Sequence, residues 1–176
     1  GEWLLTAHHA DDQLETVLLH LLRGSGMSGL AGIPRDAAFG PGRLCRPLLG
    51  VAAESLAAYA DMHLATGGPG WLTDPMNADA AFDRGFIRHD VTPVLRRRFP
   101  SVAGAIGRSA ALAAEAAGLL DELARTDARD AVEANRVSLP AMGRLGPARQ
   151  RNLVRMLVRD RGWAHHIERL MVLGSH

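Results

Sequence analysis

Lysine is absent from this chain of 176 residues, so all twenty of its basic residues are arginine. A self-contained P-loop of the form G-x-x-x-x-G-K-[ST] is therefore excluded, because that motif needs a lysine. Arginine presents a planar fork of donors that suits phosphate, although codon bias in a GC-rich genome also explains a chain rich in arginine and alanine. The formal net charge is only +1, so the overall charge does not indicate a nucleic-acid partner.

Cysteine and long apolar runs are also scarce. The single cysteine, Cys45, excludes an internal disulfide and any zinc site built from four cysteines. No apolar stretch is long enough to cross a bilayer, and no basic segment followed by an apolar one resembles a secretion signal. Because 47% of the residues are hydrophobic, we expect a soluble, cytoplasmic protein without membrane contact, made of one domain or of one domain and part of a second.

The apolar pattern predicts one strand followed by many helices. Residues 2–7 read as a short buried strand. A helix from about Asp12 to Arg23 follows, with Asp12 as its cap and Glu15 three positions later. Further helical segments are expected at 52–64, at 79–98 with a kink at Pro93, at 102–135 and at 147–161. This order predicts an α/β region followed by an all-α part, mostly helical in this chain. Since one strand cannot make a sheet, the chain reads as the second half of an α/β domain whose earlier strands are missing.

Three glycines, Gly24, Gly26 and Gly29, satisfy the dinucleotide-binding pattern G-x-G-x-x-G literally. That fingerprint must follow a strand and open a helix. Here the glycines follow the helix at 12–23, so the pattern indicates a helix end and a loop and not a Rossmann site.

The segment HHADDQLET, residues 8–16, allows three interpretations. As neighbours at a strand end, His8 and His9 point to opposite sides, which disfavours a shared metal ion. As a cap, Asp12 accepts backbone N–H groups, and the helix dipole favours nearby carboxylates. As a site, Asp11 and Asp12 lie at the carboxyl end of a strand, where open α/β sheets bind ligands and where carboxylates commonly hold Mg²⁺ beside phosphate. The last two interpretations are compatible.

Arginines recur at helical spacing in the rest of the chain. Arg84 and Arg88 are four residues apart and share a helix face, where pairing with Asp83 or Asp79 is the simplest role. The run at 96–98 is typical of a solvated helix end. A stripe at positions 151, 155 and 159 is either the solvent side of an amphipathic helix or a surface that faces phosphate.

Three ordered motifs carry a family resemblance: TAHHADDQLETVLLHLLRGSGMSGLAG, then RPLL, then DPMNADAAFDRGFIRHDVTPVL. Together they resemble the tRNA(Ile)-lysidine synthase family, which belongs to the N-type ATP pyrophosphatases, or PP-loop superfamily. The resemblance is dense over residues 3–98 and weaker beyond.

This resemblance implies a ligase that modifies tRNA. ATP adenylates the C2 oxygen of the wobble cytidine, position 34, in a tRNA(Ile) with a CAU anticodon, and pyrophosphate leaves. The ε-amine of free L-lysine then displaces AMP to form lysidine. The implied cofactors are ATP and Mg²⁺, the implied partners are this tRNA and lysine, and a homodimer is left open.

The resemblance also assigns residues by motif. Asp12, Glu15 and Arg84 are implied in catalysis, with Glu15 expected to position the lysine ammonium or to accept its proton. Arg84 and Arg23 are expected to face the charge of the adenylate. The residues implied in nucleotide binding are His9, Asp11, Asp12, Arg23, Gly24, Ser25 and Gly26. Those implied in binding tRNA or substrate are Asp74, Asn77, Asp79, Arg84 and Arg88, and Asp11 and Asp12 are implied as Mg²⁺ ligands.

The family's S-G-G-x-D-S phosphate-binding loop does not occur in this sequence. We therefore expect residues 1–99 to be the C-terminal part of the nucleotide-binding domain, 100–135 a long helical linker and 136–176 the start of a helical tRNA-binding domain, and we expect the isolated chain to be inactive. Two alternatives stay open: a tRNA thiolase of the same superfamily, which normally uses paired cysteines, and a non-catalytic RNA-binding helical module.

Overall fold

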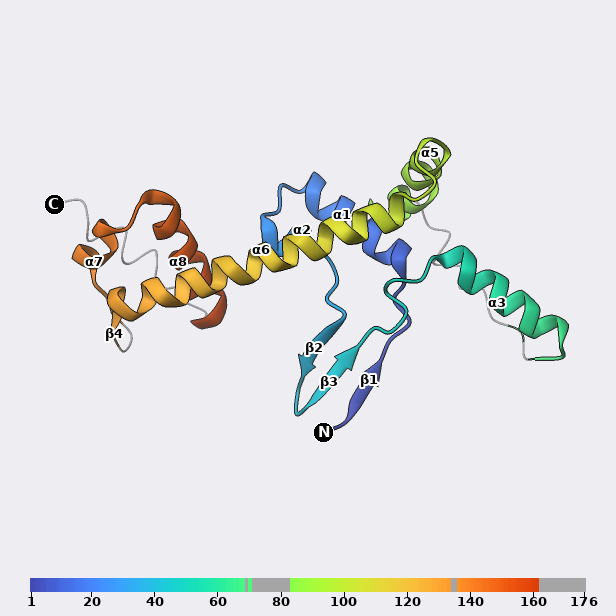
Figure 1. Ribbon diagram of the computed structural model, residues 1–176, viewed down its shortest axis with the longest axis horizontal. Helices are drawn as coiled ribbons and strands as arrows, with labels where there is room; N and C mark the ends of the chain where they lie inside the picture. Colours follow the sequence, from blue (N-terminus) through green and yellow to red (C-terminus); the bar gives the residue numbers. More distant parts are fainter. Residues whose placement is uncertain (69, 71–82, 134–135, 162–176) are drawn as a thin grey trace. The chain divides into compact units, whose positions relative to one another are not determined.

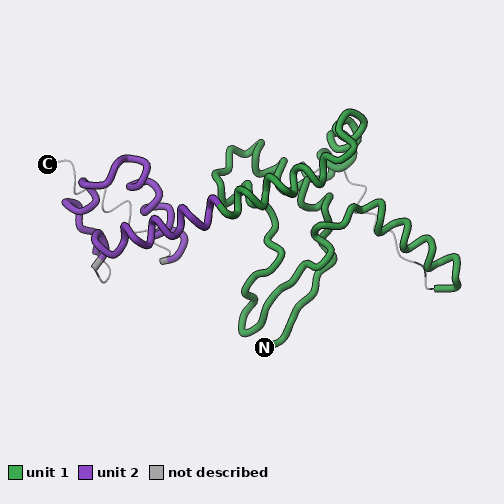
Figure 2. The backbone as a smooth tube through the Cα atoms, viewed as in Figure 1, with its two compact units in different colours: residues 1–115 green, residues 116–176 purple. Residues whose placement is uncertain are grey.

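The computed structural model describes residues 1–68, 70, 83–133 and 136–161 (Figure 1). The chain forms two compact units, Gly1–Glu115 and Ala116–His176 (Figure 2). The helix α6, Val102–Ala131, belongs to both units. The domain boundaries predicted after residues 99 and 135 remain predictions. Within the described residues, no helix combines the length and apolar character needed to span a membrane.

A three-stranded sheet lies at the start of the first unit. Its strands are β1 (Trp3–Leu5), β2 (Asp36–Phe39) and β3 (Gly42–Cys45), in the order β1-β3-β2. β1 runs parallel to β3, and β2 and β3 form an antiparallel hairpin. Gly42 permits the close approach to β1, because a Cβ there would lie 2.4 Å from the carbonyl oxygen of Glu2. This hairpin was not predicted from the sequence, because its strands lack a clear alternation of apolar and polar residues.

The expected strand at residues 2–7 exists, but the prediction that it is buried is wrong for this chain. Trp3 and Leu5 are 59% and 64% exposed, and Leu4 is 44% exposed. Both faces of β1 therefore lack a covering layer among the described residues.

The apolar stripe of α1, Ala10–Leu22, forms the core of the first unit as its spacing predicts. Leu14 is fully buried, and it packs in one cluster with Ala10, Val102 and Ala103. The helix ends at Arg23, and Gly24 follows with φ +72°, a conformation that favours glycine. The prediction that the glycine-rich segment closes a helix is thus confirmed, and a short helix α2, Met27–Leu30, lies within that segment.

Four further helical segments complete the first unit: α3 (Ala53–Ala65), α4 (Asp83–Phe86), η2 (Ile87–Val91) and α5 (Thr92–Arg98). The last three run in succession, and η2 is a wider π-helical turn. Pro93 explains this turn, because proline has no N–H to donate and its ring crowds the carbonyl one turn earlier. The kink predicted at Pro93 therefore takes the form of a local widening.

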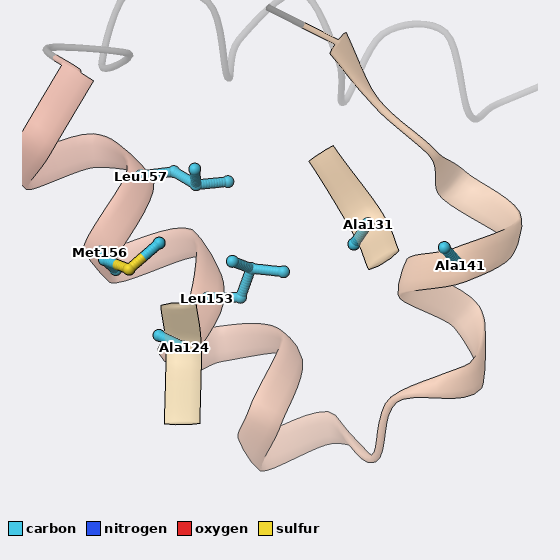
Figure 3. Packing of buried hydrophobic residues seen from close by; sticks show 6 residues of the cluster. All are labelled: Ala124, Ala131, Ala141, Leu153, Met156 and Leu157. Carbon is cyan, nitrogen blue, oxygen red and sulfur yellow. The ribbon is translucent and has the colours of Figure 1, made fainter. Parts of the chain in front are cut away.

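The second unit packs the end of α6 against α8, Pro147–Arg161. A short hairpin, β4 (Val132–Glu133) with β5 (Arg136–Val137), and the helix α7, Leu139–Arg144, connect them. Figure 3 shows the buried side chains of this core, which are Ala124, Ala131, Ala141, Leu153, Met156 and Leu157. The apolar face predicted for the helix at 147–161 is confirmed.

Candidate active site

The first turn of α1 uses a different cap from the predicted one. His9 is the N-cap in extended conformation (φ −128°, ψ −176°), and its ring accepts from the backbone N–H of Asp11 at 3.3 Å. Asp12 is the third residue of the helix and accepts from the backbone N–H of His9 at 2.9 Å. This reciprocal capping box satisfies two helix-end donors. Because His9 and Asp12 close the box, Glu15 is not needed there and points elsewhere.

Glu15 is the centre of the candidate site. Its side chain is only 3% exposed, and both of its oxygens accept hydrogen bonds from arginine. Arg84 Nε donates to Oε2 at 2.8 Å, while Arg88 donates from Nε to Oε1 at 2.6 Å and from Nη2 to Oε2 at 2.9 Å. A buried carboxylate requires such partners, since an unpaired charge is costly to remove from water.

Asp12 joins the same cluster from one turn earlier. Arg84 Nη2 donates to Asp12 Oδ1 at 3.0 Å, and Arg88 Nη2 lies 3.6 Å from the same oxygen. The hydrogen bond that Arg88 donates to Glu15 raises the pKa of Arg88 above its ordinary value, with smaller contributions from the charges of Asp12 and Asp11. The Arg88 guanidinium is thus held in its charged form beside the two carboxylates.

The simplest role predicted for Arg84 and Arg88, pairing with Asp83 on the same helix, is wrong. Asp83 instead accepts a hydrogen bond from Arg23 Nη2 at 2.6 Å, and both side chains of that pair are mostly exposed. The arginines bind α1 because residues four apart on a helix present one face. Asp79, the other predicted partner, lies outside the described residues.

Asp11 points to a different neighbour. Its Oδ2 accepts from the backbone N–H of Ala53 at 2.8 Å, and its Oδ1 accepts from Arg96, which also pairs with Glu54. The interpretation of Arg96 as part of a solvated helix end is therefore wrong. Its spacing was the available signal, since position 96 continues the four-residue series of Arg84 and Arg88.

The predicted Mg²⁺ ligands, Asp11 and Asp12, do not fit a metal site in this arrangement. Every oxygen of the two carboxylates already accepts a hydrogen bond, two of them from arginine. Elsewhere in the described parts of the chain, no group of three or more histidine, cysteine or acidic residues is arranged to hold a metal ion.

The remaining predicted residues divide into two groups. Arg23, Gly24, Ser25 and Gly26 form the turn after α1, where the Ser25 N–H donates to the His20 carbonyl at 2.9 Å. Through its pair with Asp83, Arg23 brings this turn to the start of α4. Asp74, Asn77 and Asp79 lie outside the described residues. The roles predicted for both groups remain predictions.

Comparison with known proteins gives the class to which this arrangement belongs. Residues 1–95 match the family model ATP_bind_3, which is described as a PP-loop domain. The chain therefore belongs to the PP-loop domain family, and this membership supports ATP as the nucleotide of the domain.

Curated relatives narrow the comparison to one enzyme. The chain is 51% identical over 155 residues to the tRNA(Ile)-lysidine synthase of Alkalilimnicola ehrlichii. This alignment covers 88% of this chain and 34% of the relative. It is 42% identical to the same enzyme of Nitrosomonas europaea over 92% of this chain and 35% of the relative. It is 43% identical to the same enzyme of Pseudomonas aeruginosa over 88% of this chain and 37% of the relative. The chain thus spans about a third of the length of these relatives.

Proposed function

We propose that the complete protein containing this chain is a tRNA(Ile)-lysidine synthase, a ligase that uses ATP. The wobble cytidine of tRNA(Ile) attacks the α-phosphorus of ATP through its C2 oxygen, and pyrophosphate leaves. The ε-amine of lysine then attacks C2, the bond from C2 to the adenylate oxygen breaks, AMP leaves and the amine loses a proton. The relatives' shared name and the PP-loop match support this proposal.

One observation in this chain supports this chemistry. Glu15 holds Arg84 and Arg88 beside Asp12, and we call these two arginines the arginine fork. Arg84 and Arg88 spend Nε and Nη2 on carboxylates, and among the described residues nothing accepts a hydrogen bond from Nη1 of either one. Their side chains are 43% and 34% exposed. Two partly exposed guanidinium groups held in place by carboxylates suit the phosphate of an adenylate, because preorganised cations stabilise developing negative charge.

In this proposal Glu15 positions the fork and does not accept the proton of the attacking amine. An ammonium group has little access to a carboxylate that is 3% exposed and already takes three hydrogen bonds from arginine. A general base must come within hydrogen-bond reach of the proton that it removes. Arg84 and Arg88 contact the adenylate, and Glu15 acts through them. Asp11 and Asp12 are each paired with an arginine, so we assign no metal-dependent step to them.

The thiolase alternative gains no support from the single cysteine. Cys45 lies across the strand pair from Asp36, and the hydrogen bond with Asp36 raises the pKa of the Cys45 thiol. The protonated thiol is a poor nucleophile at neutral pH.

The test uses the complete polypeptide that contains this chain, a tRNA(Ile) transcript with a CAU anticodon, ATP and lysine. Pyrophosphate release and a nucleoside with the mass of lysidine are expected together. Omission of lysine should leave an adenylated tRNA, and a transcript with uridine at the wobble position should give neither product. A folded protein that binds ATP and this tRNA but forms no lysidine would refute the proposal.

A further inference from the structure

Three helix ends meet at the Asp11 carboxylate. The backbone N–H of Ala10 donates to the Val51 carbonyl at 2.9 Å, so the starts of α1 and α3 lie together. The N-cap of α3, Ala52, has no side chain that can cap, and Asp11 supplies the missing acceptor to the Ala53 N–H at 2.8 Å. The third element is the last turn of α5, which provides Arg96.

Arg96 joins the two helix starts with one guanidinium group. Nη2 donates to Asp11 Oδ1 and Nη1 donates to Glu54 Oε1, in the first turn of α3. The Asp11 and Arg96 side chains are 10% and 30% exposed, whereas Glu54 is 62% exposed. The pair with Asp11 is therefore the more strongly desolvated of the two contacts, and its geometry matters more.

We propose that Arg96 is a positioning residue for the adenylation step, because it fixes Asp11 and through it the turn of α1 that presents Asp12 and Glu15 to the arginine fork. This inference rests on the proposed function. Arg96 does not touch the fork itself. It acts through the backbone of α1, in which Asp11 directly precedes Asp12.

Electrostatics explains why the Asp11 charge needs its own cation. The charge of Asp11 already contributes to the raised pKa of Arg88, so the two groups interact across the cluster. Without Arg96, Asp11 would be a poorly solvated carboxylate left with His9, whose Nδ1 lies 3.8 Å from Asp11 Oδ2, and with the charge of Arg88. Arg88 would then divide its hydrogen bonds between Asp11 and Glu15, and the fork would lose its fixed geometry. Small displacements of this kind in a catalytic group lower the rate of the chemical step more than the affinity for substrate.

The experiment compares Arg96→Gln and Arg96→Lys with Arg97→Gln in the complete polypeptide. Arg97 is exposed and lies in the same helical turn, so its substitution removes the same charge without any of these contacts. For Arg96→Gln we expect kcat for tRNA-dependent pyrophosphate release to fall about tenfold to a hundredfold, with KM for ATP unchanged. Arg97→Gln should keep the wild-type rate. The kcat of Arg96→Lys should lie between those of Arg96→Gln and the wild type, because one ammonium group can pair with Asp11 but cannot span to Glu54.

Hydrogen exchange gives a second readout that does not need activity. In Arg96→Gln, the amides of residues 10–15 and 53–56 should exchange faster than in Arg97→Gln, while those of α8 stay unchanged. A wild-type rate in Arg96→Gln, an equal loss in Arg97→Gln, or a rise in KM at constant kcat would overturn the proposal. If Arg96→Gln does not fold, a wild-type kcat in Arg96→Lys would overturn it.

The two proposals can fail separately. If the wild-type protein releases no pyrophosphate, the proposed function fails. If hydrogen exchange at residues 10–15 is unchanged in Arg96→Gln, the positioning role of Arg96 fails.

Discussion

Arg84 Nε donates to Glu15 Oε2 at 2.8 Å, although the two residues are 69 positions apart in the chain. This contact ties α4 to the middle of α1 and buries the Glu15 carboxylate. It also engages Nε of Arg84, while Asp12 accepts from Nη2 of the same guanidinium group. The geometry of the two arginines is thus set by a carboxylate that is almost fully buried.

Replacement of Glu15 by Gln should disable the fork and weaken the fold together. The amide NH₂ would face guanidinium donors, and two arginines would lose their buried counter-charge. We expect lysidine formation by the complete protein to fall at least about a hundredfold, with a lower unfolding midpoint in urea. Because Glu15 and Arg84 belong to one hydrogen-bonded cluster, the losses from Glu15→Gln and Arg84→Gln should be less than additive when the two changes are combined.

The exposed residue Glu115 provides the control for this experiment. Glu115→Gln removes the same charge and should leave both activity and stability unchanged. A different outcome would identify Glu15 as the general base. In that case the Glu15→Gln protein would keep native stability, and the pH dependence of its kcat would lose only the low-pH limb.

Local patterns in the sequence predicted the elements but not their partners. The apolar stripe around Leu14 and the face of Leu153 gave the correct helices, because a period of 3.6 residues is a property of the segment itself. The capping shift from Asp12 to His9 was missed because a histidine ring rarely serves as a cap. The pairing of Arg96 with Asp11 spans 85 positions, and a single sequence contains no information on which surface arginine folds back onto which acid.

Gly32 should not tolerate a side chain. It has φ +65°, and a Cβ there would lie 2.6 Å from Gln13 Oε1 and 2.9 Å from Val17 Cγ2. The same Gln13 oxygen accepts the Ile33 N–H at 2.7 Å, which holds the loop after α2 against α1. We expect Gly32→Ala to destabilise the first unit by about 1–3 kcal/mol in urea unfolding.

The matched control is Gly107→Ala. Gly107 lies in α6, where an added Cβ would meet nothing within 4 Å. This change should instead stabilise the folded protein by about 0.5–1 kcal/mol. Equal effects at the two positions would contradict the strain argument.

Asp127 should be the most sensitive acid of the second unit. Its side chain is 1% exposed, and Arg149 holds both of its oxygens, raising the pKa of Arg149. Asp127→Asn keeps the shape but places an amide NH₂ against the guanidinium group, so we expect a clear fall in melting temperature. Asp130 lies three residues later on α6 and is exposed, and Asp130→Asn should melt as the wild type does. Similar melting curves for the two variants would show that the pair contributes nothing.

Leu153 should dominate the apolar core of the second unit. It is fully buried on α8, where it packs in one cluster with Ala124, Ala131, Ala141, Met156 and Leu157 (Figure 3). Leu153→Ala removes the side chain and leaves a cavity, so we expect a loss of about 2–5 kcal/mol in urea unfolding. Leu119, on α6 in the same unit, is 67% exposed, and Leu119→Ala should change stability by less than about 0.5 kcal/mol. Since the two substitutions delete identical atoms, the difference between them measures burial alone. A Leu119→Ala loss as large as that of Leu153→Ala would mean that the exposed leucines of α6 are covered in solution.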